Sequence, residues 1–182
     1  MTTAVQNGSG RDGKNLPEDL SLYIGKKSLV KLILEAIEEL SAETSDGGDV
    51  QSGNTDFQPA MMLTLLAYCY ATGVYGSEEI QLATHDDQMI RYLCARDYPD
   101  LCQIRSFRRY NRERIVRFLA RVFRRVWEVR FCGEDAVPLA SGSCPGAYRG
   151  CWVGAIGTAD FRREAERRIM RAVRADSMAT DD

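Results

Sequence analysis

The stretch that most restricts the fold is the apolar segment "FQPAMMLTLLAYCYATGVYG", residues 57–76. It is apolar on nearly every helical face. Pro59 stands at a favourable first helical position, and Gly73 and Gly76 mark the end. The apolar run falls short of the roughly 20 residues that a membrane helix needs. The segment therefore predicts a helix buried on all sides, which other helices must cover.

Three further segments have the pattern of amphipathic helices. Residues 28–43, "SLVKLILEAIEELSAE", repeat apolar residues at helical spacing from Leu29 to Leu40, with Ser28 as the expected N-cap. Residues 112–130 carry an apolar stripe from Ile115 to Val129. A last helix, about 160–174, has one apolar face made of Phe161, Ala165, Ile169 and Val173. The sequence thus predicts an all-α fold, a small multi-helix domain.

The remaining segments divide the chain. Residues 1–15 are polar and predict a disordered tail. Residues 16–131 form the expected helical domain, interrupted by a polar linker at 44–56. Residues 132–158 are rich in Gly and Cys without a clean period, and predict an irregular segment. Residues 159–175 are then the C-terminal helix.

Charge is distributed very unevenly along the chain. Residues 1–90 carry a net charge of −9, residues 91–130 carry +8, and residues 131–182 carry −1. The stretch "QIRSFRRYNRERIVRFLARVFRRVW", residues 103–127, contains nine arginines and one glutamate. An asymmetry of this size points to an anionic partner. The alternative, in which the acidic first ninety residues neutralise these arginines within the molecule, stays open.

Three short helices are expected between Ser77 and Asn111, with Ser77 and Asp100 as caps, in a helix-turn-helix-like arrangement. In the last of them Ile104 and Phe107 can turn inward, and three arginines can share the opposite face. An apolar seat below a guanidinium face suits a helix that lies on DNA. The predicted DNA contacts are Arg105, Arg108, Arg109, Arg112, Arg117 and Arg121.

Residues 57–111 also resemble the N-terminal domain of InsH-like insertion-sequence transposases of the DDE class. That family has an "F-x-P" helix with a "Y-x-Y-x-x-G" end, a short helix beginning at Ser, a "Y-L" segment, and a "P-D" turn leading to "I-x-x-F-R". The matching residues are Phe57, Pro59, Leu63, Leu66, Tyr68, Tyr70, Gly73, Ser77, Ile80, Tyr92, Leu93, Pro99, Asp100, Ile104, Phe107 and Arg108. The resemblance implies a helical DNA-binding domain that engages transposon ends ahead of a separate catalytic domain.

The chain departs from this family pattern in three places. Glu78 and Glu79 follow Ser77 where the family has small residues and Arg, so no DNA role is carried over to them. The family's "D-G-T" strand, which bears the first catalytic Asp, does not follow the long helix, and the chain reaches only Asp182. We therefore expect a truncated protein without strand-transfer chemistry, and not an enzyme.

Other chemistry finds little support in the sequence. The six cysteines include no C-x-x-C pair and His85 is the single histidine, so neither a zinc site nor another cofactor is expected. The adjacent Asp86 and Asp87 suit a helix cap better than a metal pair. With no signal peptide or membrane segment evident, a cytoplasmic location with reduced cysteines and no membrane partner is expected.

Two further interpretations stay open beside DNA binding. The apolar stripe of residues 112–130 could form a homodimer or bind a full-length transposase, making the protein an inhibitor. The chain could also be a non-functional transposase relic.

Overall fold

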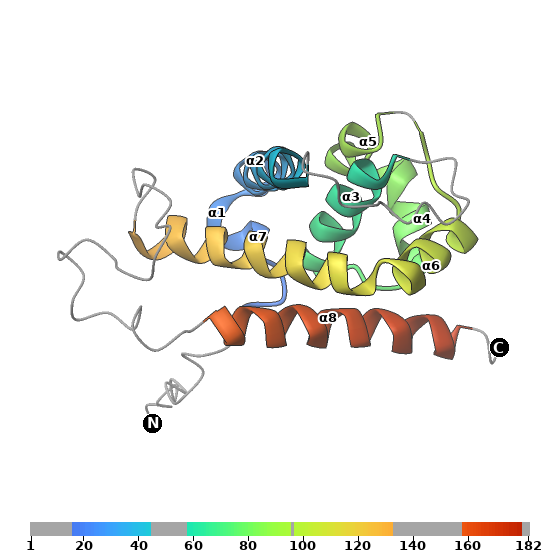
Figure 1. Cartoon of the computed structure of the whole chain (residues 1–182). Helices are drawn as coiled ribbons and strands as arrows, with labels where there is room; N and C mark the ends of the chain where they lie inside the picture. The colour runs from blue at the N-terminus through green and yellow to red at the C-terminus, as the bar shows by residue number, and fades with distance from the viewer. Residues whose placement is uncertain (1–15, 45–57, 96, 133–157, 180–182) are drawn as a thin grey trace, which may run out of the picture.

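The structure is a computed structural model that describes residues 16–44, 58–95, 97–132 and 158–179 (Figure 1). Every regular element in these ranges is an α-helix, which confirms the predicted all-α class. The helices are α1 (Ser21–Ile24), α2 (Lys26–Thr44), α3 (Pro59–Ala71), α4 (Ser77–Asp86), α5 (Gln88–Leu93), α6 (Leu101–Tyr110), α7 (Arg112–Cys132) and α8 (Thr158–Met178). The predicted tail 1–15 lies outside the described residues, as do the predicted linker 44–56 and irregular segment 132–158 except for their edges.

Helix α3 is the buried centre that the apolar segment predicts. All its side chains from Met62 to Ala71 are buried, and Pro59 is its first residue. Gly73 has a φ of 85°, and a side chain there would lie 3.2 Å from Glu18 Cγ, so glycine is needed where the chain leaves the helix. Helices α2, α5 and α7 pack around α3, and the chain thereby covers a helix with no polar face.

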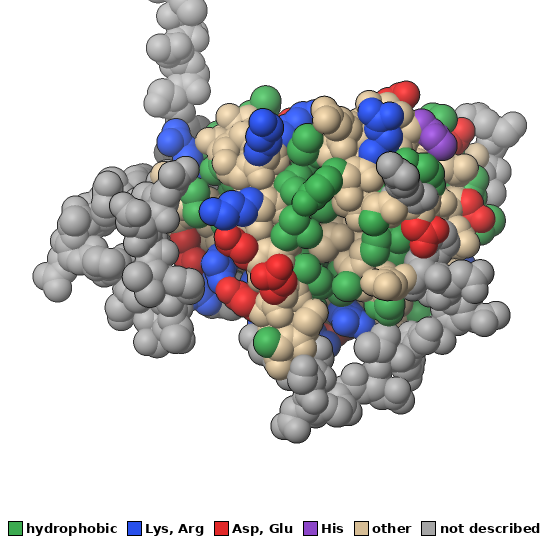
Figure 2. Space-filling model, turned by 90° about the horizontal axis from the view of Figure 1, so that it is seen from above, with side chains coloured by type: hydrophobic (Ala, Val, Ile, Leu, Met, Phe, Trp, Pro, Cys, Tyr) green, Lys and Arg blue, Asp and Glu red, His purple; other side chains and the backbone are tan. Residues whose placement is uncertain are grey.

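Helix α7 separates two layers of the molecule. Its predicted stripe is buried from Ile115 to Val126, and Val129 is partly buried. Helices α2 and α3 pack on one side, and α8 runs antiparallel to α7 on the other (Figure 1). Seen from the side of α2 and α5, away from α8, the surface mixes basic and acidic side chains around a hydrophobic patch (Figure 2). Positive charge is therefore not gathered on that face.

Helix α8 is longer than predicted and belongs to the same hydrophobic core as the other helices. Phe161, Ala165 and Ile169 are buried as expected. Val173 is 41% exposed and Ala172 is buried in its place, so the predicted apolar face is wrong at its last position. The core side of α8 ends at Ala172, and the turns after it extend beyond the core.

Arg168 fastens α8 to two distant parts of the chain. Its side chain is fully buried, and its guanidinium donates to the carbonyl oxygens of Pro17, Glu18 and Tyr70. Its Nε donates to Glu164 Oε1 at 2.9 Å, so the buried charge has an acidic partner. Because Tyr70 lies in the last turn of α3, the contact also satisfies a carbonyl that the helix itself leaves unpaired.

Candidate nucleic-acid interface

Helix α6 carries the basic segment, and its local structure follows the sequence closely. The Asp100 carboxylate accepts a hydrogen bond from Gln103 N–H at 2.8 Å, and the Gln103 side chain accepts one from Asp100 N–H at 2.8 Å. This reciprocal cap starts the helix, as predicted for Asp100. Ile104 and Phe107 are buried at 0% and 3% exposure, so they seat the helix on the core as expected.

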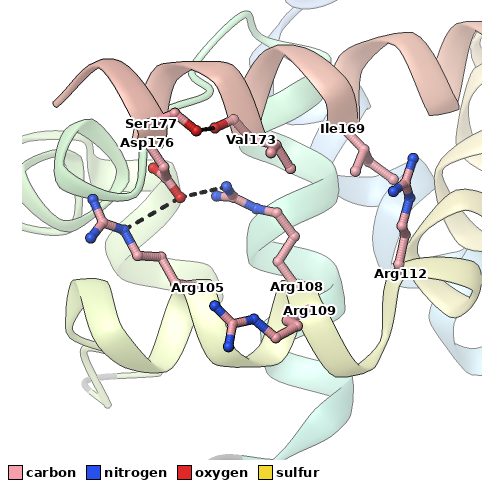
Figure 3. A pocket seen from close by; sticks show the side chains of 8 residues that line it. All are labelled: Arg105, Arg108, Arg109, Arg112, Ile169, Val173, Asp176 and Ser177. Carbon is pink, nitrogen blue, oxygen red and sulfur yellow. Dashed lines mark hydrogen bonds and ion pairs between the residues drawn. The ribbon is translucent and has the colours of Figure 1, made fainter. Parts of the chain in front are cut away.

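The structure brings four of the six predicted arginines together. A cavity of about 430 Å³ lies between α6, the start of α7 and the end of α8 (Figure 3). Its lining residues are Arg105, Arg108, Arg109, Arg112, Ile169, Val173, Asp176 and Ser177. Arg117 and Arg121 do not line it. At about 100° per residue, Arg117 lies roughly 140° around α7 from Arg112, so these two arginines belong to a different surface.

Arg108 does not share the outward face that the sequence analysis assigned to it. It is 4% exposed, donates to Asp176 Oδ2 at 2.7 Å and Ser77 Oγ at 3.1 Å, and lies 5.7 Å from the centre of the Tyr70 ring. The reason is helical spacing: Arg108 is four residues after the buried Ile104, and such positions share a face. Burial raises the pKa of Tyr70, and the neighbouring Arg108 offsets only part of that increase.

Asp176 is the central carboxylate of the cavity, a residue that no pattern in the sequence singles out. Besides Arg108, it accepts hydrogen bonds from Ser77 N–H at 2.7 Å and Ser77 Oγ at 2.8 Å. Arg105 Nε lies 3.4 Å from Asp176 Oδ2. No local pattern could have found this contact, because Ser77 and Asp176 are 99 residues apart in the chain.

Ser77 takes part because it is not the cap that the sequence predicted. Gly76 is the N-cap of α4, and Glu79 accepts a hydrogen bond from Gly76 N–H at 3.1 Å. Ser77 is therefore the first helical residue, whose N–H has no partner within the helix. Its N–H and hydroxyl are both directed to Asp176 instead. A helix N-terminus, a hydroxyl and two guanidiniums thus meet at one carboxylate.

The other arginines of the cavity carry unneutralised charge. Arg109 and Arg112 are exposed. Among the described residues neither forms an ion pair with a carboxylate, and Arg112 only donates to Met170 Sδ at 3.3 Å. Figure 3 shows Arg105 and Arg108 reaching Asp176 while Arg109 and Arg112 lie beside them. Four guanidiniums against one carboxylate leave the cavity strongly positive, which suits an anionic ligand.

Within the described residues, neutralisation by the acidic first ninety residues is visible at Arg125. Arg125 of α7 forms an ion pair with Glu39 of α2. Arg117 lies 3.8 Å from Glu113 one turn away, and both side chains are more than half exposed, so that pair contributes little. Arg105 and Arg108 pair with the C-terminal helix and not with the acidic half of the chain.

Other kinds of site find no support in the described part of the chain. It contains no group of three or more His, Cys, Asp or Glu side chains placed to hold a metal ion. Burial raises the pKa of the Cys94 thiol to about 11 and also raises that of Cys69, whereas Cys102 on α6 is exposed. Asp87 caps α5, as the sequence predicted for the Asp86–Asp87 pair. None of the described helices is long and apolar enough to span a bilayer.

Comparison with known protein families identifies a match over the first helices of the chain. The family described as "Transposase domain (DUF772)" matches residues 18–110, about half of the chain. No match was found among curated proteins or among solved structures. The matched region runs from just before α1 to Tyr110, the last residue of α6. It includes Ser77 and the arginines of α6, whereas α7 and α8 lie beyond it.

Proposed function

The chain belongs to the DUF772 transposase-domain family, and from this premise we propose that it is a DNA-binding module that engages transposon-end sequences. In this proposal α4, α5 and α6 act as a helix-turn-helix-like unit, with α6 laid on the DNA. The contacts come from Arg105, Arg109 and Arg112 at the α6–α7 corner, and Arg117 and Arg121 are left out because they lie on a different surface of α7. Arg108 is left out because it is buried. Within the family, the InsH-like DDE class is the proposed origin, and strand-transfer chemistry is not part of the proposal.

The observation that carries the proposal is the excess of guanidinium groups at the α6–α7 corner. Arg109 and Arg112 are exposed and, among the described residues, form no ion pair with a carboxylate, while the Arg105 side chain is 35% exposed. Arginine binds phosphate through two parallel hydrogen bonds, so such a group is suited to the DNA backbone. The three residues lie within two turns at a helix junction, and one duplex could contact all of them.

A salt titration tests this proposal. If the three arginines each neutralise one phosphate, the slope of log K against log salt should be about −2.7. Arg109→Ala and Arg112→Ala should each weaken binding several-fold and make the slope less negative by about 1. Arg163→Ala is the matched control, since Arg163 is an exposed arginine near the other end of α8. Fluorescence anisotropy with labelled transposon-end duplex measures the affinity of the unmodified protein and of the three variants at each salt concentration. A flat salt dependence, or an equal loss in the control, would contradict the proposal.

Cys102 offers a second measurement on the unmodified chain. It is exposed on α6, three residues before Arg105 and seven before Arg109, so it lies close to the proposed DNA face. Bound DNA should slow its alkylation, which mass spectrometry can follow site by site. Unchanged alkylation of Cys102 in saturating DNA would exclude α6 as the contacting helix.

The apolar stripe of residues 112–130, expected as the binding surface if the protein were a dimer or an inhibitor, is not accessible. The apolar stripe of α7 is covered by α2, α3 and α8 within the same chain, so we do not offer it as a dimer interface. A homodimer or a full-length transposase as partner stays a prediction, which sedimentation velocity of the protein alone and with the transposase would test.

A further inference from the structure

The group of donors around Asp176 resembles what proteins build for phosphate. Two donors come from Ser77 at the N-terminus of α4 and one comes from the Arg108 guanidinium of α6, while Arg105 Nε forms an ion pair with Asp176 Oδ2 at 3.4 Å. Helix N-termini favour anions through unpaired N–H groups and the helix dipole, and arginine adds paired donors. The site is more than a helix end, because donors from two helices already bind an anionic group there, the carboxylate of Asp176.

The residue that fills this site sits on a weakly attached turn. The buried apolar residues of α8 end at Ala172; after it Val173 is 41% exposed and Met178 is 74% exposed. The Asp176 side chain, 14% exposed, provides the main contacts that fix this turn to α4 and α6. A helix end with few buried contacts opens at lower free energy than the core of the same helix. The turn can therefore unwind while Phe161, Ala165 and Ile169 stay packed.

An anion that replaced Asp176 would enter a favourable field. Arg109 and Arg112 line the same cavity and, within the described residues, lack a carboxylate partner. We propose that Ser77, Arg105 and Arg108 form a binding site for a phosphate group of the DNA backbone, which Asp176 occupies as a built-in competitor until the last turn of α8 opens. This inference rests on the proposed DNA-binding function. It adds a specific site for one backbone phosphate. It also means that competition from Asp176 of α8 lowers the affinity of the protein for DNA.

The first experiment removes the competitor and keeps its shape. Asp176→Asn should bind duplex DNA about tenfold more tightly than the unmodified protein, because the phosphate no longer has to displace a carboxylate. Asp160→Asn is the matched control. It makes the same change of net charge at the opposite end of the same helix, where Asp160 lies 3.5 Å from Arg163. Affinity in the control should stay within about twofold.

Two further measurements test the inference even if Asp176→Asn folds poorly. Inorganic phosphate at millimolar concentration should raise the melting temperature of Asp176→Asn by several degrees more than that of Asp160→Asn, because it replaces the lost carboxylate. In the unmodified chain, saturating DNA should speed hydrogen exchange of the amides of residues 176–179, while those around Ile169 remain protected.

The outcomes separate this inference from the function on which it rests. If the unmodified protein binds DNA, but Asp176→Asn binds no better than Asp160→Asn and exchange at 176–179 is unchanged or slower, Asp176 is a structural ion pair and the inference fails alone. If no form binds DNA at low salt, the proposed function and the nucleic-acid site fail together. Tighter binding by Asp176→Asn alone, or faster exchange at 176–179 on DNA binding, supports the inference.

Discussion

Arg108 and Arg109 are neighbours in the chain with opposite environments. Arg108 is 4% exposed and bound to Asp176, whereas Arg109 is exposed on the same helix. Successive helical residues point about 100° apart, which is enough to place one in the core and the next in solvent. The inward direction of Ile104 and Phe107 followed from the sequence, and the burial of Arg108 could have followed from its spacing to Ile104. Its partner could not, because Asp176 is 68 residues away.

Because of these environments, substitutions of Arg108 and Arg109 should have opposite effects on stability and on DNA binding. Arg108→Ala removes one partner of a buried ion pair and should lower the free energy of unfolding by about 3 kcal/mol. Arg109→Ala should change it by less than about 0.5 kcal/mol and should act on DNA binding instead. Urea unfolding followed by circular dichroism measures the stability of both. Equal stability of the two variants would mean that the Asp176 contact contributes nothing to the fold.

At the scale of elements, helix positions were easier to predict than helix partners. The cap of α6 and the buried centre of α3 follow from local sequence, since capping and apolar spacing are local properties. The start of α4 was misplaced by one residue because Gly76 and Ser77 are both acceptable caps. The exposure of Val173 depends on where α8 meets the arginine cavity, which only long-range packing decides.

The cap of α5 predicts a dependence of stability on pH. Burial alone would raise the pKa of Asp87, but the hydrogen bonds from Lys26 and from the Met89 and Ile90 N–H groups outweigh it, and the net pKa is lowered from 3.8. The folded state therefore favours the carboxylate, and the unfolded chain binds more protons below that value. This stabilisation is complete above pH 3.8 and is lost as the pH falls through the lower pKa of the folded state.

Asp87→Ala should cost about 1 kcal/mol at pH 7, as the loss of an N-cap does. The difference from the unmodified protein should shrink as the pH falls below 3.8. Chemical unfolding at pH 7 and in the acid range measures both, and Asp86→Ala, at the last residue of α4, is the adjacent control. A difference that grows in acid would assign the stabilisation to another group.

For the whole molecule, the class of fold was predictable and the arrangement was not. Apolar periodicity indicates helices and a common core. The C-terminal helix expected at 159–175 is α8, which packs along α7 and completes the arginine cavity. That packing buries Arg168, a residue type that the pattern alone would place in solvent.

A substitution of Arg168 therefore tests whether α8 and the other helices unfold together. Arg168→Met keeps a long side chain but leaves three carbonyls without their donor and leaves Glu164 with Arg167 as its remaining ion-pair partner. It should lower the free energy of unfolding by about 3–5 kcal/mol. Arg163→Met, at an exposed position of the same helix, should be nearly neutral. Loss of α8 alone, with α3 still protected in hydrogen exchange, would show that the two parts unfold independently.

The same arginine has a consequence for how the protein is made. The ribosome releases Pro17, Glu18 and Tyr70 early, and their carbonyls meet Arg168 only after α8 has left the exit tunnel. Until then the nascent chain has the whole family-matched region but lacks the side chain that joins its beginning to the end of α3. Folding during synthesis should thus stay incomplete until α8 has left the exit tunnel, a period in which the newborn chain is open to chaperones and proteases.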